Sequence, residues 1–317
     1  MKMKIFLTFA LFSFISGAVN GQVSLQYGES EGRVAYSNAK NHPNEEELLP
    51  IGPLSFRVHD KEFWVLDSLA GKILRISPAG KLLSTITVTF QPIGMLEDFA
   101  LVNEPGQKVN SILVLQAESQ EIVKIGLDGK ILKKIGGRGE EPGKFTQFHR
   151  IEVSPNGEIA VSDKAKQTLA LLSADGKLIR EVHWEWSGFC FDPAGDICRL
   201  KWDETLQVNY LLIETPSGKK IKEFALAIGP HTNPDLWFVG KDGEAVLSYI
   251  PQEGFKGKYG VAKCDPSGKP IIVQDLVPPI AMNRFFVQAE PGNFFLAAAN
   301  YDLAPEGSFK IQPYTLK

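Results

Sequence analysis

Cysteine is scarce in this chain, with 3 residues among 317. So few cysteines exclude a small domain that depends on a framework of disulfides. Two of them, Cys190 and Cys198, flank a tight turn around residues 193–195, so we expect them opposite each other on adjacent antiparallel strands. In an oxidising compartment the pair can form a disulfide. The alternative is two small buried thiols, and Cys264 is expected in the core.

The chain also lacks any concentration of positive charge. Its 34 Lys and Arg residues are outnumbered by 37 Asp and Glu, which gives a formal net charge of −3. No stripe of basic residues offsets this balance. Proteins that bind nucleic acid use clustered positive charge to contact phosphates, so nucleic acid is not an expected partner.

Long apolar runs are absent beyond the N-terminus, and the one there is too short for a spanning helix. Lys2 and Lys4 precede an apolar stretch that begins at Ile5, and small residues stand where a signal peptidase cleaves, before Gln22. Residues 1–21 are therefore predicted to be a signal peptide. We expect a mature protein that is exported to the periplasm or beyond, has no membrane span and is a monomer.

Helical periodicity is missing as well, and short apolar strands separated by polar turns take its place. A Gly-Lys pair recurs after every few strands. The marker glycines are Gly80, Gly129, Gly176, Gly218 and Gly268, at intervals of 49, 47, 42 and 50 residues. A period in the forties that is made of short strands is typical of the blades of a β-propeller.

Six such units fit between residues 51 and 317. The sequence therefore predicts an all-β fold, a six-bladed β-propeller of four-stranded antiparallel blades. The last unit supplies three strands, whereas a strand-like segment at residues 23–27 has no blade of its own. We expect residues 22–50 to form a closing strand and a loop, with that N-terminal strand completing the last blade.

One unit carries a more specific pattern. Residues 136–179 run from a glycine-rich segment with Pro-Gly-Lys-Phe into an inner strand, then through an Asp corner to a strand that ends in Asp-Gly. This unit resembles those of the NHL-repeat family of propellers, and the units at 51–86 and 91–135 match more loosely. The resemblance implies a six-bladed propeller. It leaves both binding and enzymatic roles open, because a fold alone does not select a function.

Candidate functional residues follow from the geometry of a propeller, in which the start of each innermost strand points to the mouth of the central channel. Aligning these strands, and adding two tryptophans from the divergent fourth and fifth blades, gives the predicted binding residues Glu97, Asp98, His149, Arg150, Trp186, Asp235, Trp237 and Arg284. Aromatic faces suit glycans and peptides because they offer a large rigid contact area.

Four side chains near the channel have the chemistry of a metal site. Glu97, His149, Asp235 and Asn283 offer carboxylate, imidazole and amide donors, which suit ions such as Ca, Mn or Zn. The resemblance implies two precedents: amidating lyases hold a metal through His residues, and lactonase-type propellers use carboxylates and Asn. A polar channel filled with water is the alternative interpretation.

The favoured interpretation is an exported module that binds a protein, peptide or glycan through its channel mouth and loop face. An enzymatic role is less favoured, because no G-x-S-x-G motif or other nucleophile motif occurs and no catalytic residue is assigned. The alternative is a metal-dependent hydrolase or lyase, lactonase-like or amidating-lyase-like, with His149 as its candidate ligand or base.

Overall fold

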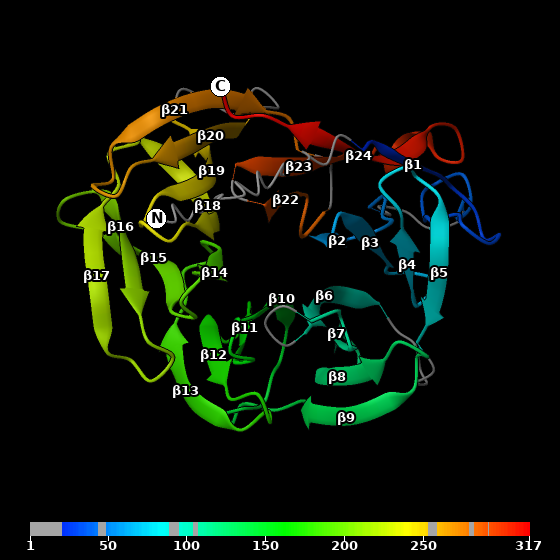
Figure 1. The fold of residues 1–317 in the computed structure, drawn as a ribbon, viewed down its shortest axis with the longest axis horizontal. Helices are drawn as coiled ribbons and strands as arrows, with labels where there is room; N and C mark the ends of the chain where they lie inside the picture. Colours follow the sequence, from blue (N-terminus) through cyan, green and yellow to red (C-terminus); the bar gives the residue numbers. More distant parts are fainter. Residues whose placement is uncertain are drawn as a thin grey trace, which may run out of the picture.

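The computed structural model describes residues 21–43, 49–88, 95–103, 107–252, 259–278, 282–290 and 292–317. In these ranges the strands form six four-stranded antiparallel sheets set around a central axis (Figure 1). The helical content of the same ranges is a single 3-10 turn, η1 (Tyr301–Leu303). The all-β six-bladed propeller is therefore confirmed, whereas the predicted signal peptide lies, apart from Gly21, outside the described residues.

Each blade is a meander whose first strand is innermost and whose last is outermost. Blade one has β2 (Ser55–His59), β3 (Glu62–Asp67), β4 (Lys72–Ile76) and β5 (Leu82–Thr87). Blade two has β6 (Leu96–Val102), β7 (Ser111–Gln116), β8 (Glu121–Gly126) and β9 (Ile131–Gly136). Blade three has β10 (Phe148–Val153), β11 (Ile159–Asp163), β12 (Thr168–Leu172) and β13 (Leu178–His183).

The remaining blades repeat this order. Blade four has β14 (Phe189–Phe191), β15 (Ile197–Asp203), β16 (Val208–Glu214) and β17 (Lys220–Ala225). Blade five has β18 (His231–Val239), β19 (Ala245–Pro251), β20 (Tyr259–Cys264) and β21 (Pro270–Leu276). Blade six has β22 (Phe286–Glu290), β23 (Asn293–Ala298), β24 (Ser308–Tyr314) and, from the other end of the chain, β1 (Val23–Gln26).

The N-terminal strand closes the ring, as the sequence predicts. β1 pairs antiparallel with β24, with Val23 opposite Ile311 and Leu25 opposite Phe309 (Figure 1). Val23 and Leu25 are buried while their neighbours face solvent, which is the alternation expected of an outermost strand. Because one sheet holds the first and last strands of the chain, the two ends of the chain are joined within a single blade.

The marker glycines lie in equivalent places, at the turn between the third and fourth strands of five blades. All five have a positive φ, from 77° at Gly80 to 101° at Gly218. Two of them also allow close packing: a Cβ on Gly129 would lie 2.1 Å from the carbonyl oxygen of Thr87, and one on Gly268 would lie 1.8 Å from that of Ala225. Both oxygens belong to the preceding blade, so these glycines permit contact between blades.

The Asp corner of the repeat has a structural role. In blade three the buried carboxylate of Asp163, at the end of β11, accepts hydrogen bonds from the backbone N–H groups of Thr146, Gln147 and Ala165. Thr146 and Gln147 lie in the loop that leads into β10. The corner therefore fixes the point at which an innermost strand begins, and with it the start of the channel wall.

In the described part of the chain, no helix has the length and apolar character needed to cross a membrane.

Candidate functional site

Three innermost strands are irregular at the predicted site residues. The pairing register shifts between Leu96 and Phe99 in β6, between Phe148 and Ile151 in β10, and between Thr232 and Asp235 in β18. A β-bulge breaks the strict alternation of side chains and can turn two consecutive residues toward one side. These bulges hold the pairs Glu97–Asp98, His149–Arg150 and Asn233–Pro234 at the channel.

Arg150 lies at the centre of the channel. Its guanidinium forms a two-point ion pair with Asp235, with Nη1–Oδ1 and Nη2–Oδ2 distances of 2.6 Å. Its Nε donates to the side-chain oxygen of Asn283 at 3.0 Å, and its Cζ lies 4.3 Å from the ring centroid of Trp237. Arg150 is almost fully buried, and planar pairing of this kind fixes its orientation.

A second network lies one residue further along the strands, around the fully buried carboxylate of Asp98. Asp98 accepts hydrogen bonds from Ser55 Oγ at 2.5 Å and from the backbone N–H of Ile151 at 3.1 Å. It also pairs with Arg57 at 3.3 Å and with Arg284 at 3.1 Å. The two networks together fill the middle of the ring and leave a pocket at each end of the innermost strands.

The pocket at the N-terminal ends of these strands, hereafter the N-side pocket, has a volume of about 680 Å³. Arg150 and Asp235 form its floor, and Trp186 stands on its rim. Trp186 is 55% exposed although it is a large apolar side chain, and its φ of 59° lies in the left-handed region. Nζ of Lys164 lies 5.8 Å from the centroid of the Trp186 ring.

The loop that carries Trp186 is held against blade five. The backbone N–H of Leu236 donates to the carbonyl oxygen of Ser187 at 3.0 Å. Gly188 follows with a φ of 67°, and a Cβ there would lie 2.1 Å from Oδ1 of Asp235. Glycine at this position therefore lets the loop approach the channel. Trp186 is thus a fixed feature of the rim.

Ionisable groups near this pocket are perturbed. Burial lowers the pKa of His149 well below 6.5, and the nearby charges of Arg150 and Lys164 act in the same direction. Burial raises the pKa of Glu97 to about 7 against the opposing charge of Lys164. Burial also lowers the pKa of Lys164. The His149 imidazole is therefore neutral at pH 7 and packs 5.6 Å from the buried ring of Trp184.

His231 is the other histidine of this pocket, and its neighbours fix its tautomer. Nδ1 lies 2.6 Å from the carbonyl oxygen of Gly229, which accepts only, so Nδ1 carries the proton. Nε2 then accepts from the side-chain amide of Asn209 at 2.8 Å. Both ring nitrogens are used, so His231 is a support of the pocket wall.

The four metal candidates do not fit a metal ion as they are arranged. Both carboxylate oxygens of Asp235 and the amide oxygen of Asn283 are taken by Arg150. The amide nitrogen of Asn283 donates to the backbone carbonyl oxygens of Glu97 and His149. A buried guanidinium beside these oxygens repels a cation. Across the described residues, no three His, Cys, Asp or Glu side chains gather as metal ligands would.

The predicted binding residues lie at the two ends of the channel or between them, and Glu97 lines neither pocket. His149, Arg150, Trp186 and Asp235 line the N-side pocket. Asp98 lies buried between the pockets, while Trp237 and Arg284 line the opposite one. Cys190 and Cys198 are directly paired across β14 and β15, as predicted, and both are free thiols in this structure.

Three residues that the sequence did not single out belong to these sites. Lys164 follows the Asp corner of blade three and lines the N-side pocket. Arg57 and Glu152 lie within β2 and β10 and line the opposite pocket. For Arg57 and Glu152 the available signal was a charged residue inside an innermost strand, where apolar residues would otherwise be expected.

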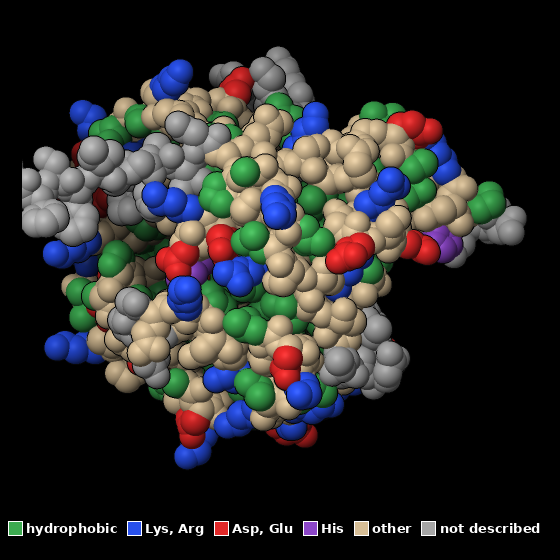
Figure 2. Space-filling view, turned by 45° about the vertical axis from the view of Figure 1, so that its right-hand side comes forward, with side chains coloured by type: hydrophobic (Ala, Val, Ile, Leu, Met, Phe, Trp, Pro, Cys, Tyr) green, Lys and Arg blue, Asp and Glu red, His purple; other side chains and the backbone are tan. Residues whose placement is uncertain are grey.

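Charged side chains of both signs lie on the face shown in Figure 2. Basic and acidic side chains are interspersed on this face, and a mixed cluster of acidic, basic and histidine side chains lies to the left of its middle. This distribution agrees with the near balance of charge in the sequence.

No protein-family model matches this chain, and no curated protein matches it either. Solved structures do. A candidate exported protein from Bacteroides fragilis has a TM-score of 0.53 at 9% identity, covering 95% of this chain and 98% of its own. A streptogramin B lyase has a TM-score of 0.51 at 13% identity, and the match covers 83% of this chain and 94% of the lyase. A luciferin-regenerating enzyme has a TM-score of 0.51 at 12% identity, and the match covers 82% of this chain and 90% of that enzyme. Likeness at such identities establishes the six-bladed propeller fold alone.

Proposed function

We propose that this chain is an exported, monomeric binding protein that holds a segment of a glycan or peptide in its N-side pocket. The observation that carries this proposal is the exposed indole of Trp186 on the rim of that pocket. An aromatic face on the rim of a concave site, above fixed polar groups, is the usual arrangement for holding a polar organic ligand.

Two separate costs at Trp186 support a functional role. A residue other than glycine in the left-handed region costs about 1 kcal/mol or more. An indole that is 55% exposed also forgoes much of the stabilisation that burial would give. Asn233, in the bulge of β18, has a φ of 48° and lines the same pocket. A strained backbone at a residue such as Trp186 is a feature found at ligand sites.

The polar lining suits a ligand that carries hydroxyl or amide groups. The amide of Asn233 and the carboxylates of Glu185 and Glu204 line the pocket, together with Lys164. The buried Ser187 hydroxyl has no hydrogen-bond partner among the described residues. A buried hydroxyl without a partner is costly, and a ligand group could supply the missing hydrogen bond. Because Arg150 and Asp235 form the floor, we expect a ligand to dock on the mouth without passing through the channel.

A second candidate function uses the same pocket for acid–base catalysis without a metal ion. The observation that favours it is that His149, Glu97 and Lys164 all have perturbed pKa values at one mouth of the channel. Perturbed groups cluster at catalytic sites. A neutral imidazole is competent as a general base, so His149 would take a proton from a bound substrate in a lyase or hydrolase reaction.

The test begins with the chain from residue 22 on a glycan array and a peptide library. Hits are then measured by calorimetry with wild type, Trp186→Ala and Ile271→Ala. Ile271 is also 55% exposed but lies on the outermost strand of blade five, so it controls for loss of an exposed apolar side chain. We expect Trp186→Ala to weaken binding by about tenfold or more and Ile271→Ala to leave it unchanged. Equal effects of the two variants would contradict the proposed site.

The enzymatic candidate needs a separate measurement. His149→Ala and His149→Gln are compared with wild type in a screen of lactones, esters and lyase substrates, with and without a chelator. Turnover that the chelator leaves intact and both variants abolish would support acid–base catalysis. Binding without turnover would leave the binding module as the function.

A further inference from the structure

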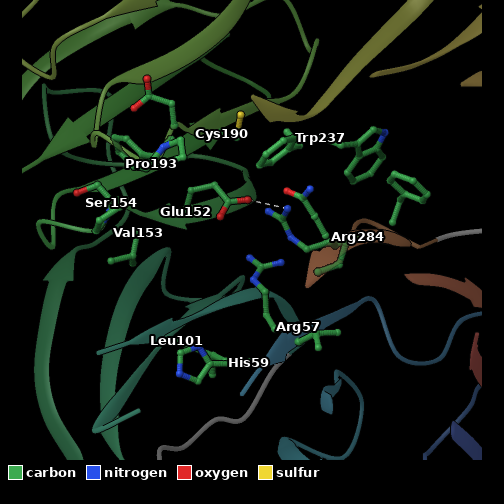
Figure 3. A pocket seen from close by; sticks show the side chains of 18 of the residues that line it. Arg57, His59, Leu101, Glu152, Val153, Ser154, Cys190, Pro193, Trp237 and Arg284 are labelled. Carbon is green, nitrogen blue, oxygen red and sulfur yellow. Dashed lines mark ion pairs between the residues drawn. The ribbon is translucent and has the colours of Figure 1, made fainter. Parts of the chain in front are cut away.

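A second pocket lies at the C-terminal ends of the innermost strands (Figure 3), and none of its lining residues lines the N-side pocket. This C-side pocket has a volume of about 460 Å³. All six innermost strands contribute to it, for example through Leu101 in β6, Phe191 in β14 and Val287 in β22. Arg57, Glu152 and Arg284 lie together at its centre in Figure 3.

Arg57 and Arg284 each have one guanidinium nitrogen that donates no hydrogen bond to the described residues. Nη2 of Arg57 donates to the carbonyl oxygen of Ile151 at 2.9 Å, but its Nη1 has no partner among the described residues. Arg284 pairs with Asp98 through Nη2, and its Nε likewise has no partner. Arg57 is 9% exposed and Arg284 is 5% exposed. Buried guanidinium donors without acceptors are costly, and a ligand acceptor would relieve that cost.

The acidic side chains nearby do not accept hydrogen bonds from these two guanidinium nitrogens. Asp98 is shared between the two arginines, Ser55 and a backbone N–H. Glu152 pairs with Nη1 of Arg284 at 2.7 Å, so a carboxyl group fits beside this arginine (Figure 3). Asp192 lies on the rim, but its Oδ1 accepts the backbone N–H groups of Ala194 and Asp196.

The walls above the arginines are mainly apolar. Phe191, Phe238 and Phe286 line them, with Trp237 beside the centre. A free inorganic anion would leave these walls in contact with water. A ligand that combines one carboxylate with an aromatic or aliphatic body would satisfy the guanidinium donors and cover the walls at the same time.

We infer that the C-side pocket is a second binding site, separate from the N-side pocket, and that it takes a small organic carboxylate with an apolar body. The carboxylate binds between Arg57 and Arg284, the second of which already pairs with Glu152. The body of the ligand packs against the phenylalanine walls. The central networks separate this site from the other one, so the two ligands do not compete.

The inference is tested by fluorine NMR with fluorobenzoate as the probe and benzoate, acetate and inorganic phosphate as competitors. We expect fluorobenzoate to bind wild type, and benzoate to displace it at lower concentration than acetate or phosphate. No binding of fluorobenzoate to the folded protein would overturn the inference. Displacement by acetate or phosphate at the same concentration as benzoate would overturn it as well, because the apolar walls would then contribute nothing.

Variants locate the site. Arg57→Gln should weaken binding by about tenfold, the effect of losing a hydrogen bond to a charged group. Because Arg57 also belongs to a buried network, a matched pair on the half-buried rim residue Gln288 keeps the test independent of folding. Gln288→Glu should weaken binding and Gln288→Lys should strengthen it, each by about threefold or more.

Asp302→Asn is the charge control, because it makes the net charge more positive at an exposed residue of η1 that does not line the pocket. It should leave fluorobenzoate affinity unchanged. If Asp302→Asn and Gln288→Lys strengthened binding equally, or if neither Gln288 variant changed it, the carboxylate would not be in the C-side pocket and the inference would fall. Neither result bears on glycan or peptide binding in the N-side pocket.

Discussion

Arg150 in β10 and Asp235 in β18 form a two-point ion pair across the channel, with both N–O distances at 2.6 Å. Their strands belong to the third and fifth blades, which are not neighbours in the ring. The pair therefore links two blades across the channel, and it also forms the floor of the N-side pocket. One contact thus contributes to the stability of the ring and to the shape of its binding site.

Removing one partner of this pair should destabilise the protein strongly. Asp235→Asn leaves the buried guanidinium of Arg150 without its counter-charge, which typically costs about 3–5 kcal/mol. The control is Asp175→Asn, because Asp175 pairs with Lys177 on the surface, where solvent screens the pair and its contribution to stability is small. Urea unfolding of both variants measures the difference. Equal losses would mean that Arg150 finds another acceptor.

Contact between blades should depend on glycine at the outer turns. Gly268→Ala places a methyl group 1.8 Å from the carbonyl oxygen of Ala225 and also strains a positive φ. Gly307→Ala has a similar φ of 89°, but a Cβ there meets nothing within 4 Å. We expect about 1–2 kcal/mol of destabilisation for Gly307→Ala from the backbone alone and a clearly larger loss for Gly268→Ala. Thermal unfolding followed by circular dichroism gives the comparison.

Closure of the ring should depend on the inward face of β1. Val23→Asp buries a charge opposite Ile311, whereas Gln26→Asp places the same charge on the exposed face of the same strand. The first change should release β1, lower the midpoint of thermal unfolding and expose β24 as a free edge that pairs between molecules. The second should behave as wild type. Calorimetry and analytical size-exclusion chromatography test both points, and similar behaviour of the variants would contradict the closure.

Stability should fall as the pH rises toward neutrality. Burial and the charge of Asp98 raise the pKa of Glu152 from 4.5 to about 7, although Arg57, Arg150 and Arg284 lie near it. Between these two pH values the folded protein holds a proton that the unfolded chain releases, so the free energy of unfolding decreases with increasing pH. Glu97 acts in the same direction.

Glu152→Gln removes one of these two contributions. Its free energy of unfolding should therefore decline less than that of wild type between about pH 5 and pH 7. Urea unfolding at a series of pH values measures the slope. A slope equal to that of wild type would show that Glu152 stays ionised in the folded state.

Much of the fold could be predicted from the sequence because its signals are local. The turn that contains Gly176 repeats in five blades, and each copy needs a positive φ that glycine supplies. The last unit supplied only three strands and the strand-like segment at residues 23–27 had no blade of its own, which sufficed to assign β1 to the last blade. The opposed positions of Cys190 and Cys198 followed from one short turn.

The site could be predicted only in part, because its geometry depends on bulges. Strict alternation would send His149 and Arg150 to opposite faces, yet the register shift in β10 brings both to the N-side pocket. Arg150 donates to Asp235 and Asn283, and both of these acceptors lie on strands or loops that are far from it in the sequence. A single sequence gives no distance between such residues. The C-side pocket was missed for the same reason, since Arg57 and Glu152 meet only after the ring closes.

The most direct test of the central claim is fluorine NMR of protein labelled with fluorotryptophan. The chain has 5 tryptophans, and substitution of each by phenylalanine assigns its resonance. On titration with the ligand found by the glycan and peptide screens, we predict that the Trp186 resonance shifts in proportion to saturation, while that of Trp64, buried in blade one, does not move. A saturating ligand that leaves the Trp186 resonance unchanged would contradict the assignment of the N-side pocket as the binding site.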